Sequence, residues 1–138
     1  MKGEHKFIDT NILVYAHDTS AGRKYDEAKD LVRELWNGPY PPAVSTQVLQ
    51  ELYVNLTRKK IAPEVATKLV ESYYAWEVIA VDQAALSSAF GIHTGYKISF
   101  WDALIVAAAK RAGADSIISE DLNAGQRYEG MLVRNPFK

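Results

Sequence analysis

Short apolar runs alternate along the chain with longer segments in which apolar residues recur every three or four positions. The short runs predict strands at residues 6–9, 43–45, 77–81 and 115–119, and a shorter fifth strand at 131–134. The periodic segments predict helices at residues 11–17, 21–37, 46–58, 63 to about 75, 82 to about 94 and 99–112. Because helices separate the strands, we expect an α/β fold with a mostly parallel sheet and helices on both of its faces.

The length and composition indicate one globular domain spanning residues 1–138. Apolar residues make up 48% of the chain, which excludes a disordered protein. The 16 basic and 17 acidic residues nearly cancel, so net charge does not indicate a nucleic-acid binder. The chain lacks cysteine, a signal-peptide pattern and any apolar run long enough to span a membrane. We therefore expect a soluble cytoplasmic protein.

Four carboxylates lie at positions that such a fold could bring together. Asp9 ends the first predicted strand, and Asp121 follows the fourth. Glu51 lies on the helix after the second strand, and Asp102 lies near the start of a late helix. In parallel sheets the ligand crevice lies beyond the carboxyl ends of the strands. Converging carboxylates require a cation, and a hard divalent ion such as Mg²⁺ together with these ligands is typical of phosphate chemistry.

Each carboxylate also has a purely structural interpretation. Asp9 can cap the short helix that follows it, and Asp102 lies three residues after Ser99, which is capping-box spacing. Glu51 can be a flank residue of an amphipathic helix, and Asp121 can be first-turn charge. The three histidines have no metal-ligand spacing, and neither a nucleophile elbow nor a glycine-rich phosphate loop is present.

Two further groups have open roles. The basic clusters at residues 58–60 and 110–111 fall at predicted helix ends, where positive charge complements the helix dipole, and they can also contact RNA phosphates. The aromatic residues Tyr73, Tyr74 and Trp76 suit either the core or a two-fold interface, and aromatic faces can also stack on bases.

Four motifs in this order resemble the PIN-domain nucleases, specifically VapC-type toxins of toxin-antitoxin pairs. The motifs are Asp-Thr-Asn at residues 9–11, a mid-chain Glu51, Ser-Phe-Trp-Asp-Ala-Leu-Ile at 99–105 and Ser-Glu-Asp-Leu at 119–122. The resemblance covers essentially the whole chain. It implies a three-layer α/β/α fold with about five parallel strands, cleavage of RNA that depends on Mg²⁺ or Mn²⁺, a homodimer, and inhibition by an antitoxin whose C-terminal tail enters the active-site groove.

The resemblance also assigns roles to residues of this chain. It implies that the metal-binding and catalytic quartet is Asp9, Glu51, Asp102 and Asp121. Asn11 and Ser119 would orient carboxylates or water. Glu120, directly before Asp121, is a second acidic candidate in the last motif.

Two other functions compete with the ribonuclease. A magnesium-dependent phosphohydrolase of small molecules would usually carry a second aspartate two residues after Asp9, where this chain has Asn11. A non-catalytic interaction module would keep the fold for partner binding alone, and the intact acidic quartet argues against it. We also expect a homodimer that covers the aromatic residues at 73, 74 and 76.

Overall fold

A six-stranded sheet in the order β3-β2-β1-β4-β6-β5 forms the centre of the protein, for which a computed structural model describes residues 4–138. Its parallel strands are β1 (Lys6–Ile8), β2 (Ala43–Ser45), β3 (Glu77–Ile79), β4 (Ser116–Ile118) and β6 (Met131–Arg134). The edge strand β5 (Arg127–Tyr128) runs antiparallel to β6. The predicted α/β fold with a mostly parallel sheet is therefore confirmed.

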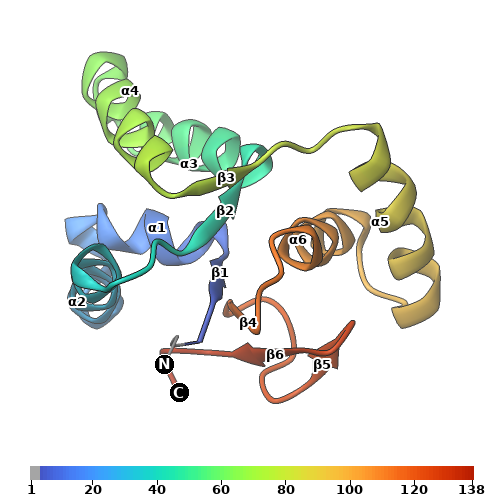
Figure 1. Ribbon diagram of the computed structural model, residues 1–138. Helices are drawn as coiled ribbons and strands as arrows, with labels where there is room; N and C mark the ends of the chain where they lie inside the picture. Colours follow the sequence, from blue (N-terminus) through green and yellow to red (C-terminus); the bar gives the residue numbers. More distant parts are fainter. Residues whose placement is uncertain (1–3) are drawn as a thin grey trace.

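Helices cover both faces of this sheet. Figure 1 shows α1 and α2 on one side of the strands and α5 and α6 on the other, with α3 and α4 beside the β2–β3 end. Their bounds are α1 (Thr10–Ala16), α2 (Arg23–Asn37), α3 (Thr46–Arg58), α4 (Pro63–Ser72), α5 (Gln83–Tyr96) and α6 (Phe100–Arg111). Across residues 4–138, none of the helices combines the length and apolar character that crossing a bilayer requires.

Helix α6 is the most deeply buried of these helices, with seven consecutive buried residues from 103 to 109. Such continuous burial requires cover on more than one side, and α6 lies between the sheet and α5. Small side chains allow this close packing, since four of the seven residues are alanine. The first turn of α6 is consequently fixed against the sheet, and that turn carries Asp102.

Local differences from the sequence prediction have local causes. A short 3₁₀ turn, η1 (Thr19–Ala21), precedes α2, which begins at Arg23, and a second turn, η2 (Tyr73–Ala75), follows α4. Strand β5 was not predicted, because two residues show no periodicity. It joins β6 through a two-residue turn in which Glu129 and Gly130 both have positive φ, as a type I′ hairpin requires.

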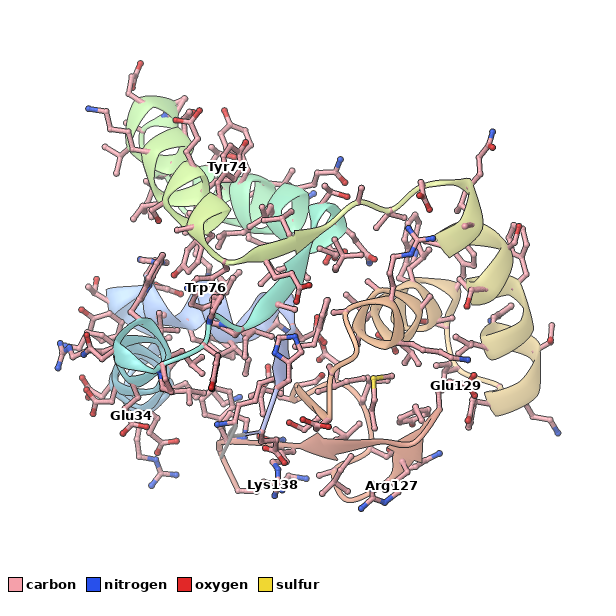
Figure 2. All side chains as sticks on the ribbon, in the orientation of Figure 1. Glu34, Tyr74, Trp76, Arg127, Glu129 and Lys138 are labelled. Atoms are coloured by element: carbon pink, nitrogen blue, oxygen red, sulfur yellow. The ribbon has the colours of Figure 1, made fainter. Side chains whose placement is uncertain are left out.

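The aromatic residues at the end of α4 do not share one environment. Tyr73 and Trp76 are 1% and 4% exposed, and their rings pack edge to face with centroids 4.8 Å apart. Tyr74, in η2, is 63% exposed and lines a groove between α3 and α4, where Figure 2 labels it. The expectation that all three are available to a partner is wrong for Tyr73 and Trp76, because the hydrophobic core already covers them.

Candidate active site

A pocket of about 440 Å³ at the carboxyl ends of the central strands is lined by all four predicted carboxylates: Asp9, Glu51, Asp102 and Asp121. The chain runs outward from β1 through β2 to β3 and then returns to β4 on the other side of β1. Strand order thus reverses between β1 and β4, where open α/β sheets bind ligands. The fold brings together residues that are as far as 112 positions apart, at 9 and 121.

Asp9 is a buried carboxylate at the end of β1. It is the N-cap of α1, and its Oδ1 accepts a hydrogen bond from the Thr10 backbone N–H at 2.7 Å. Its Oδ2 accepts from the Ser119 hydroxyl at 2.8 Å. Burial, together with the nearby negative charges of Asp121 and Asp102, raises the pKa of Asp9 to about 6. The two hydrogen bonds favour the ionised form and oppose this rise.

Glu51 is held from two directions on α3. The Thr10 hydroxyl donates to Glu51 Oε1 at 2.6 Å, and the Asn55 amide donates to the Glu51 backbone oxygen at 2.8 Å. Sequence reasoning gave Thr10 no role, although a polar residue at the start of the otherwise apolar helix α1 was an available signal. Thr10 therefore couples the Asp9 cap to the carboxylate of Glu51.

Ser119 connects the two strand ends. Its hydroxyl, which is fully buried, donates to Asp9 and accepts from the backbone N–H groups of Asp121 at 3.1 Å and Leu122 at 3.3 Å. Asn11 donates to Asp121 Oδ2 at 3.1 Å. Burial raises the pKa of Asp121, with the charges of Glu120 and Asp102 adding to the effect. Ser119 and Asn11 are thus placed to orient the carboxylates of Asp9 and Asp121, respectively.

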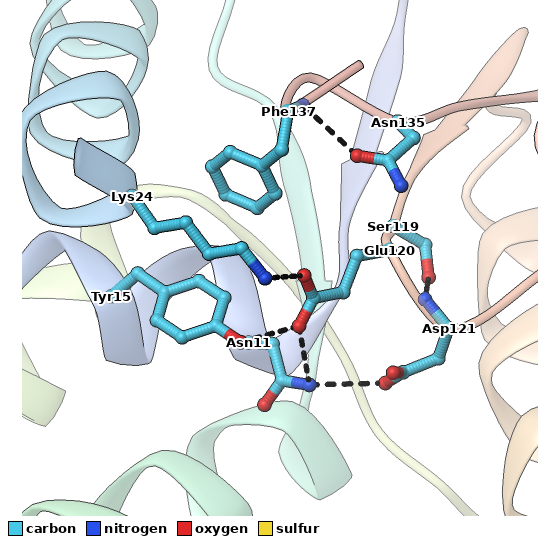
Figure 3. A network of polar contacts seen from close by, with 8 residues as sticks. All are labelled: Asn11, Tyr15, Lys24, Ser119, Glu120, Asp121, Asn135 and Phe137. Carbon is cyan, nitrogen blue, oxygen red and sulfur yellow. Dashed lines mark hydrogen bonds and ion pairs between the residues drawn. The ribbon is translucent and has the colours of Figure 1, made fainter. Parts of the chain in front are cut away.

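Glu120 does not line the pocket but joins a polar network behind it, which Asn11 connects to Asp121 (Figure 3). The Lys24 ammonium donates to Glu120 Oε2 at 2.8 Å, and the Tyr15 hydroxyl donates to Oε1 at 2.5 Å. Burial opposes ionisation of Glu120, but the hydrogen bonds from Lys24 and Tyr15 outweigh it and lower the pKa. Of the two neighbouring acids, Asp121 is the one that lines the pocket.

Asp102 fits both of its interpretations, as a residue of a helix cap and as a carboxylate of the pocket. Its backbone N–H donates to the hydroxyl of Ser99, the N-cap of α6, at 3.0 Å. This bond uses the backbone of Asp102 and leaves the carboxylate to line the pocket. A residue in the first turn of a helix also places its negative charge at the favourable end of the helix dipole.

The donor set fits a hard divalent cation. Every charged ligand candidate is a carboxylate oxygen, and Mg²⁺ and Mn²⁺ prefer oxygen ligands with water completing the shell. Within residues 4–138, no three histidine or acidic side chains stand close enough to form a compact metal cluster. The carboxylates of Glu51, Asp121 and Asp9 instead accept hydrogen bonds from Thr10, Asn11 and Ser119, respectively, along the pocket walls.

The two basic clusters separate in the structure. Arg58 lines the pocket, whereas Lys59 pairs with Asp18 at 3.0 Å. In the other cluster, Lys110 pairs with Glu129 at 2.9 Å and Arg111 with Asp82 at 2.7 Å. Ion pairs on the surface therefore engage Lys59, Lys110 and Arg111, and Arg58 is the one among these four that lines the same pocket as the carboxylates. The pocket has further lining residues to which the sequence pattern assigned no role at the site: Gln47, Gln50, Val54, Asn55, Trp101 and Ile105.

A central parallel sheet with an acidic pocket at its switch point defines a class of α/β proteins suited to phosphate chemistry. The family model of the PIN domain matches residues 6–129. The chain belongs to the PIN domain family. No curated protein sequence matches the chain significantly.

Solved structures show the same fold. A toxin-antitoxin complex from Klebsiella pneumoniae contains a chain that is 25% identical, with a TM-score of 0.68 and coverage of 95% of this chain and 97% of that one. VapC20 of Mycobacterium tuberculosis, a toxin that cleaves the sarcin-ricin loop, is 19% identical over 84% of this chain and 89% of its own, with a TM-score of 0.67. A chain in the DNA-bound VapBC of Salmonella typhimurium is 18% identical over 97% of this chain and 99% of its own, with a TM-score of 0.68.

Proposed function

We propose that the protein is a metal-dependent endoribonuclease that hydrolyses RNA phosphodiester bonds and acts as the toxin of a toxin-antitoxin pair. The observation that carries the proposal is the convergence of Asp9, Glu51, Asp102 and Asp121 on one pocket at the switch point of the sheet. Membership of the PIN domain family supports it, as does likeness to toxins such as VapC20. A phosphohydrolase fits less well, because Asn11 donates to Asp121 from the position where a second aspartate would be expected.

In this proposal Asp9, Glu51, Asp102 and Asp121 hold Mg²⁺ or Mn²⁺ and thereby form the catalytic set. A divalent ion bound there supplies an acidified water and positive charge to balance the transition state. Thr10, Asn11 and Ser119 keep the carboxylate oxygens oriented through hydrogen bonds of 2.6 to 3.1 Å. Hydrolysis by water requires no attack by the 2′-hydroxyl and leaves a 5′-phosphate and a 3′-hydroxyl.

The structural neighbours support an antitoxin as one partner. Several of them are toxin-antitoxin complexes, including the Klebsiella pneumoniae complex and VapBC of Salmonella typhimurium. We infer that a cognate antitoxin binds this chain and inhibits it, and that the active form is a homodimer. Co-expression with the neighbouring open reading frame, followed by co-purification and loss of RNA cleavage, tests the antitoxin.

Cleavage of a panel of structured RNAs with Mg²⁺ or Mn²⁺ tests the nuclease. Asn caps a helix about as well as Asp, so Asp9→Asn keeps the α1 cap while it removes the charge and the acceptor for the Ser119 hydroxyl. We expect Asp9→Asn and Asp102→Asn each to cut at least roughly 100-fold more slowly than wild type. Asp82→Asn is the matched control, since Asp82 caps α5 through the Ala85 N–H but does not line the pocket.

Two results would contradict this assignment. If Asp9→Asn cleaves RNA as fast as Asp82→Asn does, Asp9 is only a helix cap. If wild type leaves RNA intact while hydrolysing small phosphate esters, the chain is a phosphohydrolase. Analysis of the product ends checks the chemistry, because attack by the 2′-hydroxyl would instead give a cyclic phosphate.

A further inference from the structure

The pocket has an exposed tryptophan in its wall. Trp101 lies directly before Asp102 in the first turn of α6 and lines the pocket, yet it is 63% exposed. Core packing does not require this side chain, because the buried side of α6 begins only at Ala103. A large aromatic face open to solvent beside charged ligand candidates indicates a binding role.

The ring of Trp101 continues into other aromatic side chains. Phe100 contacts Trp101 edge to face with ring centroids 5.6 Å apart, and Phe90 of α5 stacks on Phe100 at 5.6 Å with an interplanar angle of 27°. Phe90 is itself exposed. Phe90, Phe100 and Trp101 together form an aromatic strip, which runs from the pocket wall onto α5.

Gln47 holds the backbone at one end of this strip and has an acceptor oxygen without a hydrogen-bond partner in the described chain. Its Nε2 donates to the Trp101 backbone oxygen at 3.3 Å, which ties α3 to the start of α6. The residue lines the pocket and is only 7% exposed, but its Oε1 has no hydrogen-bond partner within the described chain. A buried acceptor without a partner beside a pocket indicates a donor that a water or a ligand supplies.

Arg58 provides the positive charge that an anionic ligand needs. It is exposed in the last turn of α3, and it is the only basic residue among the pocket-lining residues of the described chain. Its guanidinium forms no ion pair with any residue from 4 to 138. The pocket therefore combines an aromatic face, a free cation and the carboxylates.

We propose that Trp101 stacks on an unpaired nucleobase next to the scissile bond while Arg58 holds a neighbouring phosphate. This inference rests on the proposed function and names the side chains that would hold the RNA on either side of the scissile bond. Bases within a duplex already stack on each other, so an aromatic side chain reaches a base face only where pairing is open. Charge complementarity between Arg58 and a polyanion favours RNA over a protein partner on the same strip.

Binding measured in chelator separates this inference from cleavage. The probe is a single-stranded RNA of about ten nucleotides, compared with the same RNA paired to its complement. We expect wild type to prefer the single strand and Trp101→Ala to weaken single-strand binding by roughly 5- to 100-fold, while Trp101→Phe retains most of the affinity. Tyr40→Ala is the control, because Tyr40 is an exposed aromatic residue beside the amino ends of the strands, in a different pocket.

Salt dependence distinguishes the two side chains. The logarithm of the binding constant falls with the logarithm of salt by about 0.7 per phosphate contact in single strands. Arg58→Gln should therefore reduce this slope by about 0.7, whereas Trp101→Ala should leave it unchanged. Arg33→Gln on α2 is the charge-matched control, since Arg33 lines a separate pocket. Stacking should also quench wild-type tryptophan fluorescence, and Trp101→Phe should remove that quenching.

Several results would overturn the inference. These are equal affinity of wild type for single strand and duplex, no binding of the single strand at all, or unchanged affinity in Trp101→Ala. A change of sedimentation mass in Trp101→Ala without a change of RNA affinity would make the strip a protein interface. If wild type binds through Trp101 but never cleaves RNA with Mg²⁺ or Mn²⁺, the nuclease proposal fails and the stacking site stands.

Discussion

At the scale of single residues, the pocket depends on a few hydroxyl and amide groups that hold carboxylates. Ser119 is the clearest example, because one buried hydroxyl serves Asp9, the Asp121 backbone and the Leu122 backbone. The Thr10 hydroxyl likewise donates a hydrogen bond to the carboxylate of Glu51. Removing such a group leaves a buried polar atom unpaired, which costs more than the bond itself contributes.

Ser119→Ala should therefore destabilise the protein by roughly 1 to 3 kcal/mol and weaken Mg²⁺ binding, because Asp9 Oδ2 and two backbone N–H groups lose their partner. Urea unfolding in chelator measures the first effect, and thermal shift with Mg²⁺ measures the second. Ser72→Ala is the control, since the Ser72 hydroxyl is exposed and bonds only the Leu69 oxygen in the preceding turn. Equal stability of the two variants would show that Ser119 does not organise the site.

Asp9 makes stability depend on pH in the metal-free protein. Its pKa is about 6 in the folded state against an ordinary 3.8, so between these values the folded protein keeps a proton that the unfolded chain has released. The free energy of unfolding should thus fall as pH rises from about 4 to above 6, by an amount on the order of 3 kcal/mol from this residue.

Asp9→Asn removes that contribution, because its side chain does not titrate. In chelator the variant should equal or fall below wild type in stability at pH 4 and exceed it at pH 7.5. Urea unfolding at both values measures the difference between the two proteins, which cancels the titration of other groups. A difference that stays constant with pH would show that Asp9 ionises normally in the folded protein.

At the scale of elements, the Glu120 network ties three segments together behind the pocket. Lys24 comes from α2, Tyr15 from α1 and Glu120 from the loop after β4, as Figure 3 shows. The Lys24 ammonium also lies 5.0 Å from the ring centroid of Tyr15 and 5.4 Å from that of Phe137. These contacts fix the residue before Asp121, so they orient the loop that presents Asp121 to the pocket.

Lys24→Met should weaken Mg²⁺ binding by roughly 10-fold without touching the pocket, which is the usual effect of losing a group that orients a metal ligand. Lys24→Arg should retain the ion pair and most of the affinity. Thermal shift across a magnesium titration measures both. The control is Arg23→Met, which removes a neighbouring positive charge paired with Glu27 on the surface of α2. Magnesium affinity equal to that of wild type in all three variants would show that the Glu120 network does not orient Asp121.

At the scale of the whole molecule, the proposed metal site predicts that ion binding is coupled to folding. Mutual repulsion of four negative groups destabilises the native state, and a cation that binds only the native pocket relieves it. The melting temperature should rise when millimolar Mg²⁺ or Mn²⁺ is added, and a chelator should return it to the value of the metal-free protein. An ion at 100 times its dissociation constant adds about 2.7 kcal/mol. Asp102→Asn should show a smaller rise, and a wild type that does not respond at all would contradict the metal site.

The proposed homodimer needs an apolar surface, and the structure leaves one between α3 and α4. A groove of about 750 Å³ there is lined mainly by apolar residues, among them Leu49, Tyr53, Val70 and the exposed Tyr74. Sedimentation at micromolar concentration should give twice the 15.4 kDa of the chain, and Tyr74→Glu should shift the mass toward the monomer. A wild-type mass near 15.4 kDa would exclude the dimer.

The sequence alone determined the six helices and every strand except β5, and it indicated the edge of the sheet where the candidate site lies. Helix α3 and strand β2 have the predicted bounds, because amphipathic period and cap residues are local signals that need no tertiary information. The same pattern placed Asp9 and Asp121 at the carboxyl ends of strands, where parallel sheets open their ligand crevice. Element order was therefore sufficient to predict that Asp9 and Asp121 could meet, whereas the resemblance to PIN-domain nucleases was needed to select all four carboxylates.

Only the tertiary structure decided which way individual side chains face. Glu120 and Asp121 are adjacent acids, and the choice between them depends on Lys24 and Tyr15, about 100 positions away. The burial of Tyr73 and Trp76, and the arrival of Arg58 and Trp101 at one pocket, likewise depend on how helices pack. Local propensity fixes the period of a segment, whereas the direction of a side chain at its end is set by contacts between segments distant in sequence.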